Sequence, residues 1–483
     1  MIMSLARKTT FMTLASVGQK IVAFLYFTLI ARSLGAEGTG QYFFALSFTT
    51  VFVVFVDLGL TNVLIRESAK SLDTIQSFFS TILFSKIILG VLSYITAVIV
   101  INLAGYSVDI RHLVYLSGIT MLFDSLHLSI FGVLRAIGDI KWEAISVVGS
   151  QLITLVLGSL FLWLGMPIIY LIFAFTVSSA LNALFAAAVL SRKHGIVLRP
   201  AYDKRIFFHV ARIAVPFALA AVFARVYSYA DSLILSKLAG DAAVGWYSIA
   251  YKITFAFQFV PLALVAVFYP RFSEYCETNK EKLARMFELS MKYLLAVAFP
   301  IAVGIAVLAK DIVLTLYTVE YMPSVRALQI LILSLIFSFV SFPIGAFLNA
   351  CHKQVHQTAI VGCVMVVNII LNLLLIPPYG VAGAAGAAFI GNVLLAAFGY
   401  AVVPGVTKIR HWFLFKTLLQ VGASALVMAA AVWYINLSSS FLLSILIGAI
   451  VYPVMLSVTR ALTAHDVRSL RGLLRREVVI TPE

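Results

Sequence analysis

Two pairs of cationic residues recur in this chain at one fixed spacing, and they lie in or beside hydrophobic segments. Lys20 and Arg225 are 205 residues apart, and the same shift separates Arg32 from Lys237. A charge at the centre of a membrane helix costs about 2.5–3.5 kcal/mol, and both Lys and Arg bind phosphate groups. We therefore predict that Lys20 and Arg225 face a shared polar cleft that binds an anion.

The shift of 205 residues indicates an internal repeat. It also superimposes small and aromatic residues: Gly40 on Gly245, Tyr42 on Tyr247 and Ala45 on Ala250. Further along, 132–136 resembles 345–350, and 164–165 resembles 379–380. Corresponding segments are six helices apart, an even number, so the two halves have the same orientation. Parallel repeats with a site near the midplane are one known transporter architecture.

The composition predicts that the elements carrying these residues are membrane helices. Apolar residues make up 62% of the chain and charged residues only 11%, whereas soluble domains have about 25% charged residues. A membrane helix needs about 20 apolar residues. About fourteen segments qualify, near 10–32, 41–65, 76–101, 112–134, 142–164, 168–190, 209–236, 245–269, 291–317, 326–350, 357–376, 382–403, 413–435 and 440–459. We predict an all-α integral membrane protein.

The helices and the repeat together predict five parts of the chain. They are an N-terminal six-helix lobe at 1–190, a basic cytoplasmic linker at 191–212, a C-terminal six-helix lobe at 213–403, an extra helix pair at 404–459 and a basic tail at 460–483. The extra pair has no repeat partner. The first apolar segment contains Gln19 and Lys20 and lacks a cleavage pattern, so we interpret it as a retained helix and not as a signal peptide.

The positive charge of the chain is placed asymmetrically. The net charge is +15, and an inside N-terminus puts most Lys and Arg residues on the cytoplasmic side. The positive-inside rule then predicts that both termini are cytoplasmic and that the basic tail contacts anionic lipids. The same distribution argues against nucleic acid as a partner. The three cysteines do not suggest a disulfide framework, and Cys276 and Cys351 are expected to face the cytoplasm.

Several motifs in this order resemble the multidrug/oligosaccharidyl-lipid/polysaccharide (MOP) flippase superfamily. They are Ala31-Arg32-Ser33-Leu34-Gly35, Gly40-Gln41-Tyr42, Ala45-Leu46-Ser47, Asp57-Leu58-Gly59-Leu60, Leu134-Arg135-Ala136 with Lys141 and Glu143, and Asn372-Leu373-Leu374-Leu375-Ile376-Pro377 with Tyr379-Gly380 and Gly383-Ala384-Ala385. The resemblance covers essentially the whole chain. It implies two MATE-like or MurJ-like lobes at the inner membrane.

Within that superfamily the sequence is most similar to Wzx-type flippases, which move undecaprenyl-pyrophosphate-linked oligosaccharides across the inner membrane. Two alternatives stay open. Lipid II flippases of the MurJ type usually end their first helix in an Arg-Asp pair, which Ala31-Arg32-Ser33 lacks. MATE-type cation and drug antiporters often use an acidic site in the N-terminal lobe. The first helix here has no carboxylate, although Asp57 and Asp124 lie in the same lobe.

The resemblance gives the interior cations a role. We expect Lys20, Arg225 and Lys252 to bind the pyrophosphate, with Arg32 and Lys237 as cations at the outer mouth. The alternative is that the interior cations form ion pairs that stabilise the bundle. The candidate counter-ions or coupling residues are Asp57, Asp124 and Asp231.

Two polar stripes accompany these charges. Ser117, Thr120, Asp124 and His127 share one helical face, which we expect to meet a neighbouring helix or a water-filled cavity. Tyr247, Tyr251, Thr254 and Gln258 form a second stripe, which lines a glycan path or serves helix packing. We expect no metal, because one Asp and one His are too few ligands, and no other cofactor.

A different class of function is a membrane glycosyltransferase or polymerase. Such enzymes usually carry an acidic catalytic motif near a membrane face or a sizeable outer loop. The acidic residues near the outer face here are scattered, and no P-loop pattern is present. We therefore predict a transporter and not an enzyme, with a lipid-linked oligosaccharide as substrate and membrane lipids as partners. Polysaccharide polymerase or assembly proteins are further candidate partners.

Overall fold

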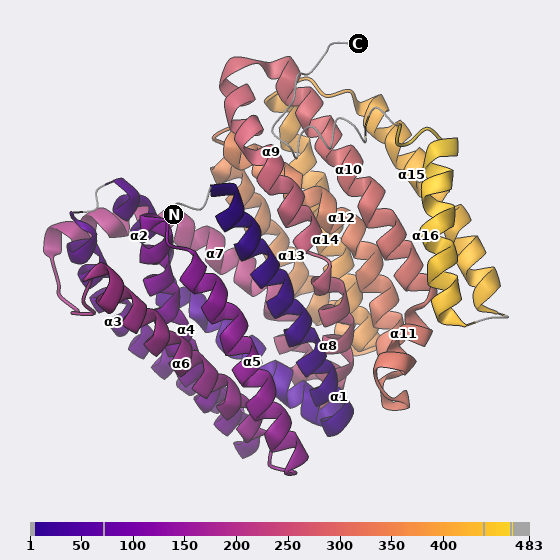
Figure 1. The fold of residues 1–483 in the computed structure, drawn as a ribbon. Coiled ribbons are helices and arrows are strands. Elements are labelled where there is room, and N and C mark those ends of the chain that lie inside the picture. Colours follow the sequence, from indigo (N-terminus) through magenta and orange to yellow (C-terminus); the bar gives the residue numbers. More distant parts are fainter. Residues whose placement is uncertain (1–4, 71–72, 438–439, 464–465, 467–483) are drawn as a thin grey trace. The chain divides into compact units, whose positions relative to one another are not determined.

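The described chain is built from helices. The computed structural model describes residues 5–70, 73–437, 440–463 and 466, and in these residues there are sixteen α-helices, two short 3-10 helices and no strand (Figure 1). A helix satisfies its backbone hydrogen bonds within one segment, as lipid requires. The α-helices are α1 (Leu5–Asp57), α2 (Leu60–Lys70), α3 (Ile75–Leu103), α4 (Val108–Ile137), α5 (Lys141–Trp163), α6 (Ile169–His194), α7 (Lys204–Ala239), α8 (Asp241–Ala256), α9 (Phe259–Thr278), α10 (Lys280–Val307), α11 (Ala309–Leu316), α12 (Ser324–Ala350), α13 (Gln354–Tyr379), α14 (Val381–Val402), α15 (His411–Asn436) and α16 (Phe441–Val458), and the 3-10 helices are Val319–Tyr321 and Val403–Gly405.

The long helix α1 contains two membrane crossings joined at Gly35. Gly35 has φ 68° and ψ −173°, a conformation that glycine adopts far more easily than other residues. Within the described residues, thirteen helical segments are long and apolar enough to span a bilayer. Because α1 supplies two of the crossings, the predicted all-α membrane fold with about fourteen spans is confirmed.

The backbone repeats the kink of α1 at the predicted offset. The shift of 205 residues places Gly35 on Gly240, which lies between α7 and α8 with φ 84° and ψ 179°. Lys20 and Arg225 each precede their glycine by fifteen residues, which is about 22 Å along a helix. The two cations therefore lie at equivalent positions on two helices that end in the same type of turn.

Two equivalent glycines make a reciprocal close contact. A Cβ atom on Gly40 would lie 1.8 Å from the carbonyl oxygen of Asp241, and one on Gly245 would lie 1.9 Å from that of Ala36. The repeat shift maps Ala36 onto Asp241 and Gly40 onto Gly245. Reciprocal contacts between equivalent residues are the property of a two-fold axis, so these two short segments are related by a local two-fold axis.

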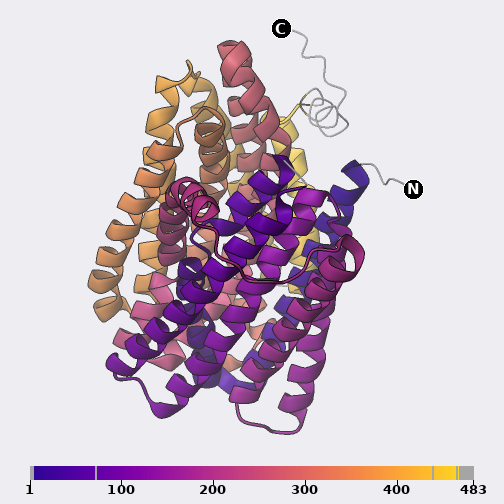
Figure 2. The same ribbon diagram turned by 90° about the vertical axis from the view of Figure 1, so that its left-hand side faces the viewer.

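The chain divides into two compact units, one ending at Ser248 and the other beginning at Ile249. The division falls within α8, later than the linker at 191–212, because α7 packs against α1, α2 and α3. In the first unit α4 packs against α6, α1 and α3, and α5 packs against α1 and α6. The irregular segment 195–203 crosses the surface of this unit (Figure 2). The core of the first unit includes Leu64, Phe79, Phe131, Leu134 and Leu190.

In the second unit α12 is the central element. It packs against α9, α10 and α14, and α13 packs against α14. Helices α15 and α16, which correspond to the predicted pair at 404–459, pack against each other and against α10 (Figure 1). One core cluster includes Phe268, Phe272, Phe287 and Phe347, and a second one joins α10 to α15 and α16.

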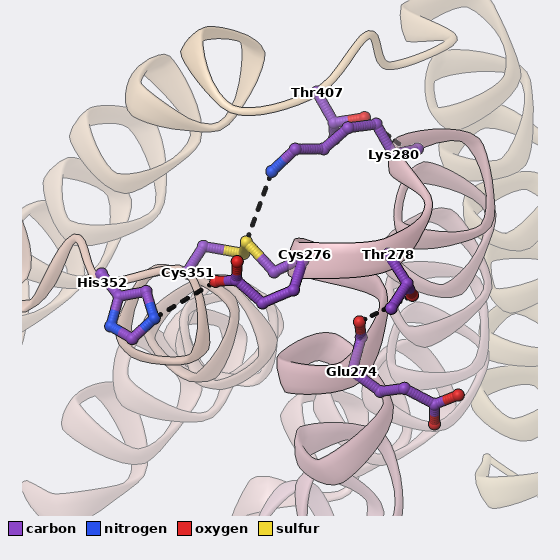
Figure 3. The surroundings of a disulfide bond; sticks show 8 residues. Glu274, Cys276, Thr278, Lys280, Cys351, His352 and Thr407 are labelled. Atoms are coloured by element: carbon purple, nitrogen blue, oxygen red, sulfur yellow. Dashed lines mark hydrogen bonds and ion pairs between the residues drawn. A yellow bond between two sulfur atoms is a disulfide. The ribbon is translucent and has the colours of Figure 1, made fainter.

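The structure differs from the sequence analysis at two cysteines. Cys276 near the end of α9 and Cys351 just after α12 form a disulfide with a Cα–Cα distance of 5.6 Å (Figure 3). The Nζ atom of Lys280 lies 3.5 Å from the Cys276 sulfur. The two cysteines are 75 residues apart in the sequence, so only the packing of α9 against α12 brings them together.

Candidate functional site

Arg225 is the most unusual charge of the first unit. It lies in the membrane-spanning part of α7, and its side chain is exposed. Among the residues that the structure describes, Arg225 makes no hydrogen bond or ion pair. Intramembrane charges almost always face a bundle interior or a water-filled cavity, where they mark substrate pathways. Lys20 on the packed neighbour α1 is half-buried and has a contact of its own.

Lys86 has a local role that the sequence analysis did not assign. Its Nζ atom lies 2.6 Å from Asp57 Oδ1, and it donates a hydrogen bond of 2.8 Å to Thr61 Oγ1. Asp57 also accepts hydrogen bonds from the backbone N–H groups of Gly59 and Thr61 at the start of α2. Asp57 is therefore the counter-ion of Lys86. The sequence signal is the Asp-Leu-Gly-Leu-Thr run, which is typical of an Asp that binds the N–H groups of a following helix.

The Lys86–Asp57 pair gives a stability prediction. We expect Asp57→Asn to destabilise the protein by about 3–5 kcal/mol, because the Lys86 side chain is only 4% exposed and would keep an uncompensated charge. Adding Lys86→Met should restore much of that loss. Thermal unfolding in detergent measures both effects. A stable Asp57→Asn protein that no longer exports glycan would instead assign Asp57 to transport.

The polar stripe on α4 faces neighbouring helices. Ser117 hydrogen-bonds with Thr49 of α1 at 2.7 Å, and Thr120 with Thr176 of α6 at 2.7 Å. Asp124 accepts a hydrogen bond from Ser179 of α6 and lies 3.7 Å from the Nδ1 atom of His127. The stripe thus joins α4 to α1 and α6. No group of three His, Cys, Asp or Glu residues suited to a metal ion is found in the described ranges.

Asp231 and Tyr247 pair within the first unit. The hydroxyl of Tyr247 donates a 2.8 Å hydrogen bond to Asp231 Oδ2, joining α7 to α8. Both residues are buried, and Tyr247 is only 1% exposed. This contact favours the packing alternative for Tyr247.

The two predicted mouth cations have different surroundings. The Nζ atom of Lys237 donates to the carbonyl oxygen of Ala104 at 2.6 Å and lies 5.0 Å from the ring centre of Tyr106. This contact ties the end of α7 to the loop between α3 and α4. Arg32 lies at the equivalent place on α1, three residues before the Gly35 kink, and its side chain is exposed.

The remaining predicted site residues begin the second unit. Lys252 is half-buried in α8, and Tyr251 stacks on Phe255 at 5.6 Å. The hydroxyl of Thr254 is buried without a hydrogen-bond partner in the described part of the chain. Helix α8 stops at Ala256, so Gln258 lies in the break before α9. Broken membrane helices near the midplane are a feature of transporter substrate sites.

Three further ion pairs join helices to neighbouring helices or loops. Arg135 at the end of α4 binds Glu143 of α5 with two hydrogen bonds. Arg410 binds Glu288 of α10, and this carboxylate raises the pKa of Arg410. Lys292 lies 2.8 Å from Asp466. Burial favours a higher pKa for Asp466, but the Lys292 and Thr463 hydrogen bonds lower it below its usual value. These bonds position helices, and the sequence shows only their charges.

Comparisons with known proteins agree with this architecture. The polysaccharide biosynthesis protein model matches residues 5–276, and the MatE model matches residues 216–374. The probable low-salt glycan biosynthesis flippase Agl15 of Haloferax volcanii is 22% identical over 448 residues, which cover 87% of this chain and 92% of that protein. The putative O-antigen transporter of Shigella flexneri is 24% identical over 383 residues, covering 74% and 87%.

Solved structures share the fold. The lipid II flippase MurJ in an inward closed conformation has a TM-score of 0.76 at 20% identity and covers 92% of this chain and 98% of that chain. The helical fold and these matches define a multi-pass membrane protein of the MOP flippase superfamily. Within it, the chain belongs to the polysaccharide biosynthesis protein family.

Proposed function

We propose that this protein translocates an undecaprenyl-pyrophosphate-linked oligosaccharide across the cytoplasmic membrane. The family match and the names of the relatives from Haloferax volcanii and Shigella flexneri support this substrate class. The protein moves its substrate without making or breaking covalent bonds, so it is a transporter and not an enzyme.

The main support for this proposal comes from the surroundings of Arg225. A guanidinium group inside a membrane span, with no hydrogen bond or ion pair to any described residue, needs a polar partner. A pyrophosphate supplies one, because the planar guanidinium group binds phosphate oxygens in a bidentate manner. The cargo of such a flippase carries this group between its lipid and its glycan.

Lys20 and Lys252 complete the proposed cation set. Lys20 lies at the position of α1 that is equivalent to Arg225 on α7, because both precede a kinked glycine by fifteen residues. Lys252 lies shortly before the break after α8, where the buried hydroxyl of Thr254 has a free hydrogen-bonding capacity. Tyr251, Thr254 and Gln258 are the proposed contacts of the glycan.

The proposed orientation places both termini in the cytoplasm. The segment between α6 and α7 then faces the cytoplasm together with the helix ends that flank it. Exposed basic residues lie in this region: Arg192, Lys193, Arg199, Lys204 and Arg205. Such an excess of positive charge is typical of cytoplasmic loops. Delivery of the glycan to the outer face makes a polysaccharide polymerase or assembly protein the proposed downstream partner.

Lipid II is the second candidate substrate, because the fold also matches that of MurJ and lipid II contains the same pyrophosphate. Export of organic cations is a third candidate, and it has less support because the charge of Asp57 in the first unit is neutralised by Lys86.

A depletion experiment tests the proposed substrate. When the protein is depleted, we expect a lipid-linked oligosaccharide to accumulate on the cytoplasmic leaflet while its export stops. Mass spectrometry of extracted lipids measures the accumulation. A membrane-impermeant label that reacts with the glycan measures which leaflet holds it. Accumulation of lipid II alone would replace the proposal by the second candidate. Unchanged export and unchanged lipid pools would contradict both.

A further inference from the structure

An apolar cavity of about 360 Å³ opens in the first unit, and none of the proposed cations is among its lining residues. It is formed by the turn between α1 and α2, one face of α3, the segment before α7 and one face of α7. Its lining is almost entirely apolar. The hydroxyl of Ser85 donates a hydrogen bond to the carbonyl oxygen of Thr81 within α3. Protein interiors rarely leave such space empty. In a membrane protein, a hollow of this size and polarity suits a hydrocarbon chain.

The cavity exists because α7 presents small side chains where larger ones would fill it. Ala211, Ala214 and Ala218 line it at helical spacing. The wall is held in place at Gly59 (φ +78°), where an added Cβ atom would lie 2.8 Å from Phe217 and 3.3 Å from the Ala214 carbonyl oxygen. Helix α7 therefore cannot move closer and close the hollow.

The depth of the cavity matches one leaflet. Its lining runs along α7 from Phe207 to Ala218, and eleven residues of α-helix extend about 16 Å. Half of the hydrocarbon thickness of a bilayer is about 15 Å. The cavity is thus about as long as one leaflet is thick, which is the length of one acyl chain.

Aromatic residues mark the end of the cavity at the membrane surface. Tyr202 lies between Phe84 and Phe207, with ring centres 5.6 Å from each. The segment that carries Tyr202 is fixed to α3: the Gln76 side chain exchanges two 2.9 Å hydrogen bonds with the backbone of Val197. Tyrosine is enriched at the level of lipid headgroups, so this end lies where a headgroup would be.

A lysine lies on the same face of α7, just beyond the cavity. Lys204 precedes Phe207 by three residues and Ala211 by seven, so it lies on the cavity face one turn farther out, and it is exposed. Two nearby carboxylates are already engaged. Asp203 accepts the N–H groups of Arg205 and Ile206, and Glu67 lies 2.7 Å from Lys70 and 3.6 Å from His209.

We propose that this cavity is a binding site for an anionic glycerophospholipid, with one acyl chain in the apolar hollow and the phosphate headgroup at Lys204. The bound lipid fills the space between α3 and α7 and is distinct from the transported substrate. The acyl chain then lies against apolar side chains, and the phosphate lies at the positive charge of Lys204.

Lipid retention tests the proposal. The full-length protein is exchanged into phosphatidylcholine nanodiscs that contain phosphatidylglycerol as a minor component, re-extracted into detergent, and analysed by native mass spectrometry. We expect the wild type to retain phosphatidylglycerol with an enrichment of about ten-fold over the nanodisc composition, as for roughly 1.4 kcal/mol of preference. Ala214→Phe fills the hollow and should reduce retained lipid of either class by about ten-fold.

Matched variants distinguish binding of the acyl chain from binding of the headgroup. Lys204→Glu should abolish the preference for phosphatidylglycerol while phosphatidylcholine is still retained, whereas Arg205→Glu, the same charge change on another face of α7, should leave the preference intact. Ala224→Phe, an exposed position of α7 outside the cavity, should have no effect on retention.

The proposal is overturned by equal retention by wild type and a folded Ala214→Phe protein, by no preference of the wild type between the two phospholipids, or by equal effects of Lys204→Glu and Arg205→Glu. If Ala214→Phe does not elute as a folded protein, Ala218→Phe at the deep end provides the same test. Recovery of a polyprenyl lipid from the cavity in place of the phospholipid would also contradict it.

Discussion

An Arg225→Ala variant is expected to reach the membrane at normal abundance and to lose glycan export. Arg225 makes no hydrogen bond or ion pair with the described residues, so its removal leaves no buried partner uncompensated and should not destabilise the fold. A charge-assisted hydrogen bond contributes about 1.5–3 kcal/mol, so substrate affinity should fall roughly ten- to a hundred-fold. Export of labelled glycan and the amount of folded protein are measured in the same cells.

Further variants test whether the positive charge of these residues is what export requires. Arg225→Lys, Lys20→Arg and Lys252→Arg should keep partial export, because Lys and Arg both bind phosphate. Arg212→Ala removes another exposed arginine of α7, thirteen residues before Arg225, and should export normally. If the interior cations serve bundle stability instead, the alanine variants lose abundance, and removing Asp231 as well restores it. Normal export by a stable Arg225→Ala, Lys252→Ala protein would exclude a cationic binding site.

Gly245→Ala is expected to disrupt the contact between α1 and α8. The new Cβ atom would lie 1.9 Å from the backbone carbonyl oxygen of Ala36, and backbone cannot rotate away as a side chain does. The helices must separate, at a cost of about 1–3 kcal/mol or more. Gly40→Ala should act in the same way, because its Cβ atom would lie 1.8 Å from the Asp241 oxygen. We expect a lower unfolding temperature in detergent and reduced export for both variants.

Gly149→Ala is the control for this pair. Gly149 lies in α5 with open space around a Cβ atom, and alanine favours a helix over glycine by about 1 kcal/mol. This variant should therefore be as stable as the wild type or more stable. An unfolding temperature of Gly245→Ala equal to that of Gly149→Ala would show that the close contact does not contribute to the fold.

Much of the fold followed from local chemistry. The apolar segments predicted the membrane helices because the bilayer demands continuous hydrophobic length, and the repeat shift predicted that Lys20 and Arg225 are equivalent. The matching kinks at Gly35 and Gly240 lie at that same shift. The helical stripe on α4 also predicted contacts with neighbouring helices, since residues at helical spacing share one face.

The partners of the charges did not follow from the sequence. Lys86 is another cation in an apolar segment, and only the packing of α3 against the α1–α2 turn shows that it binds Asp57 and Thr61. Tyr247 fitted a glycan path by spacing alone, but α7 directs Asp231 toward its hydroxyl. Periodicity gives the face of a helix and not the identity of the helix that covers it.

The sequence by itself determined the membrane class, the crossings, the repeat and the family, because each rests on hydrophobic length or on the order of residues along one chain. Only the tertiary structure decided which charges are neutralised, that Cys276 meets Cys351, and that alanines of α7 leave a cavity beside α3. These features depend on distances between segments far apart in the sequence. Such distances are set by how side chains of different helices fill space together, and no single segment encodes them.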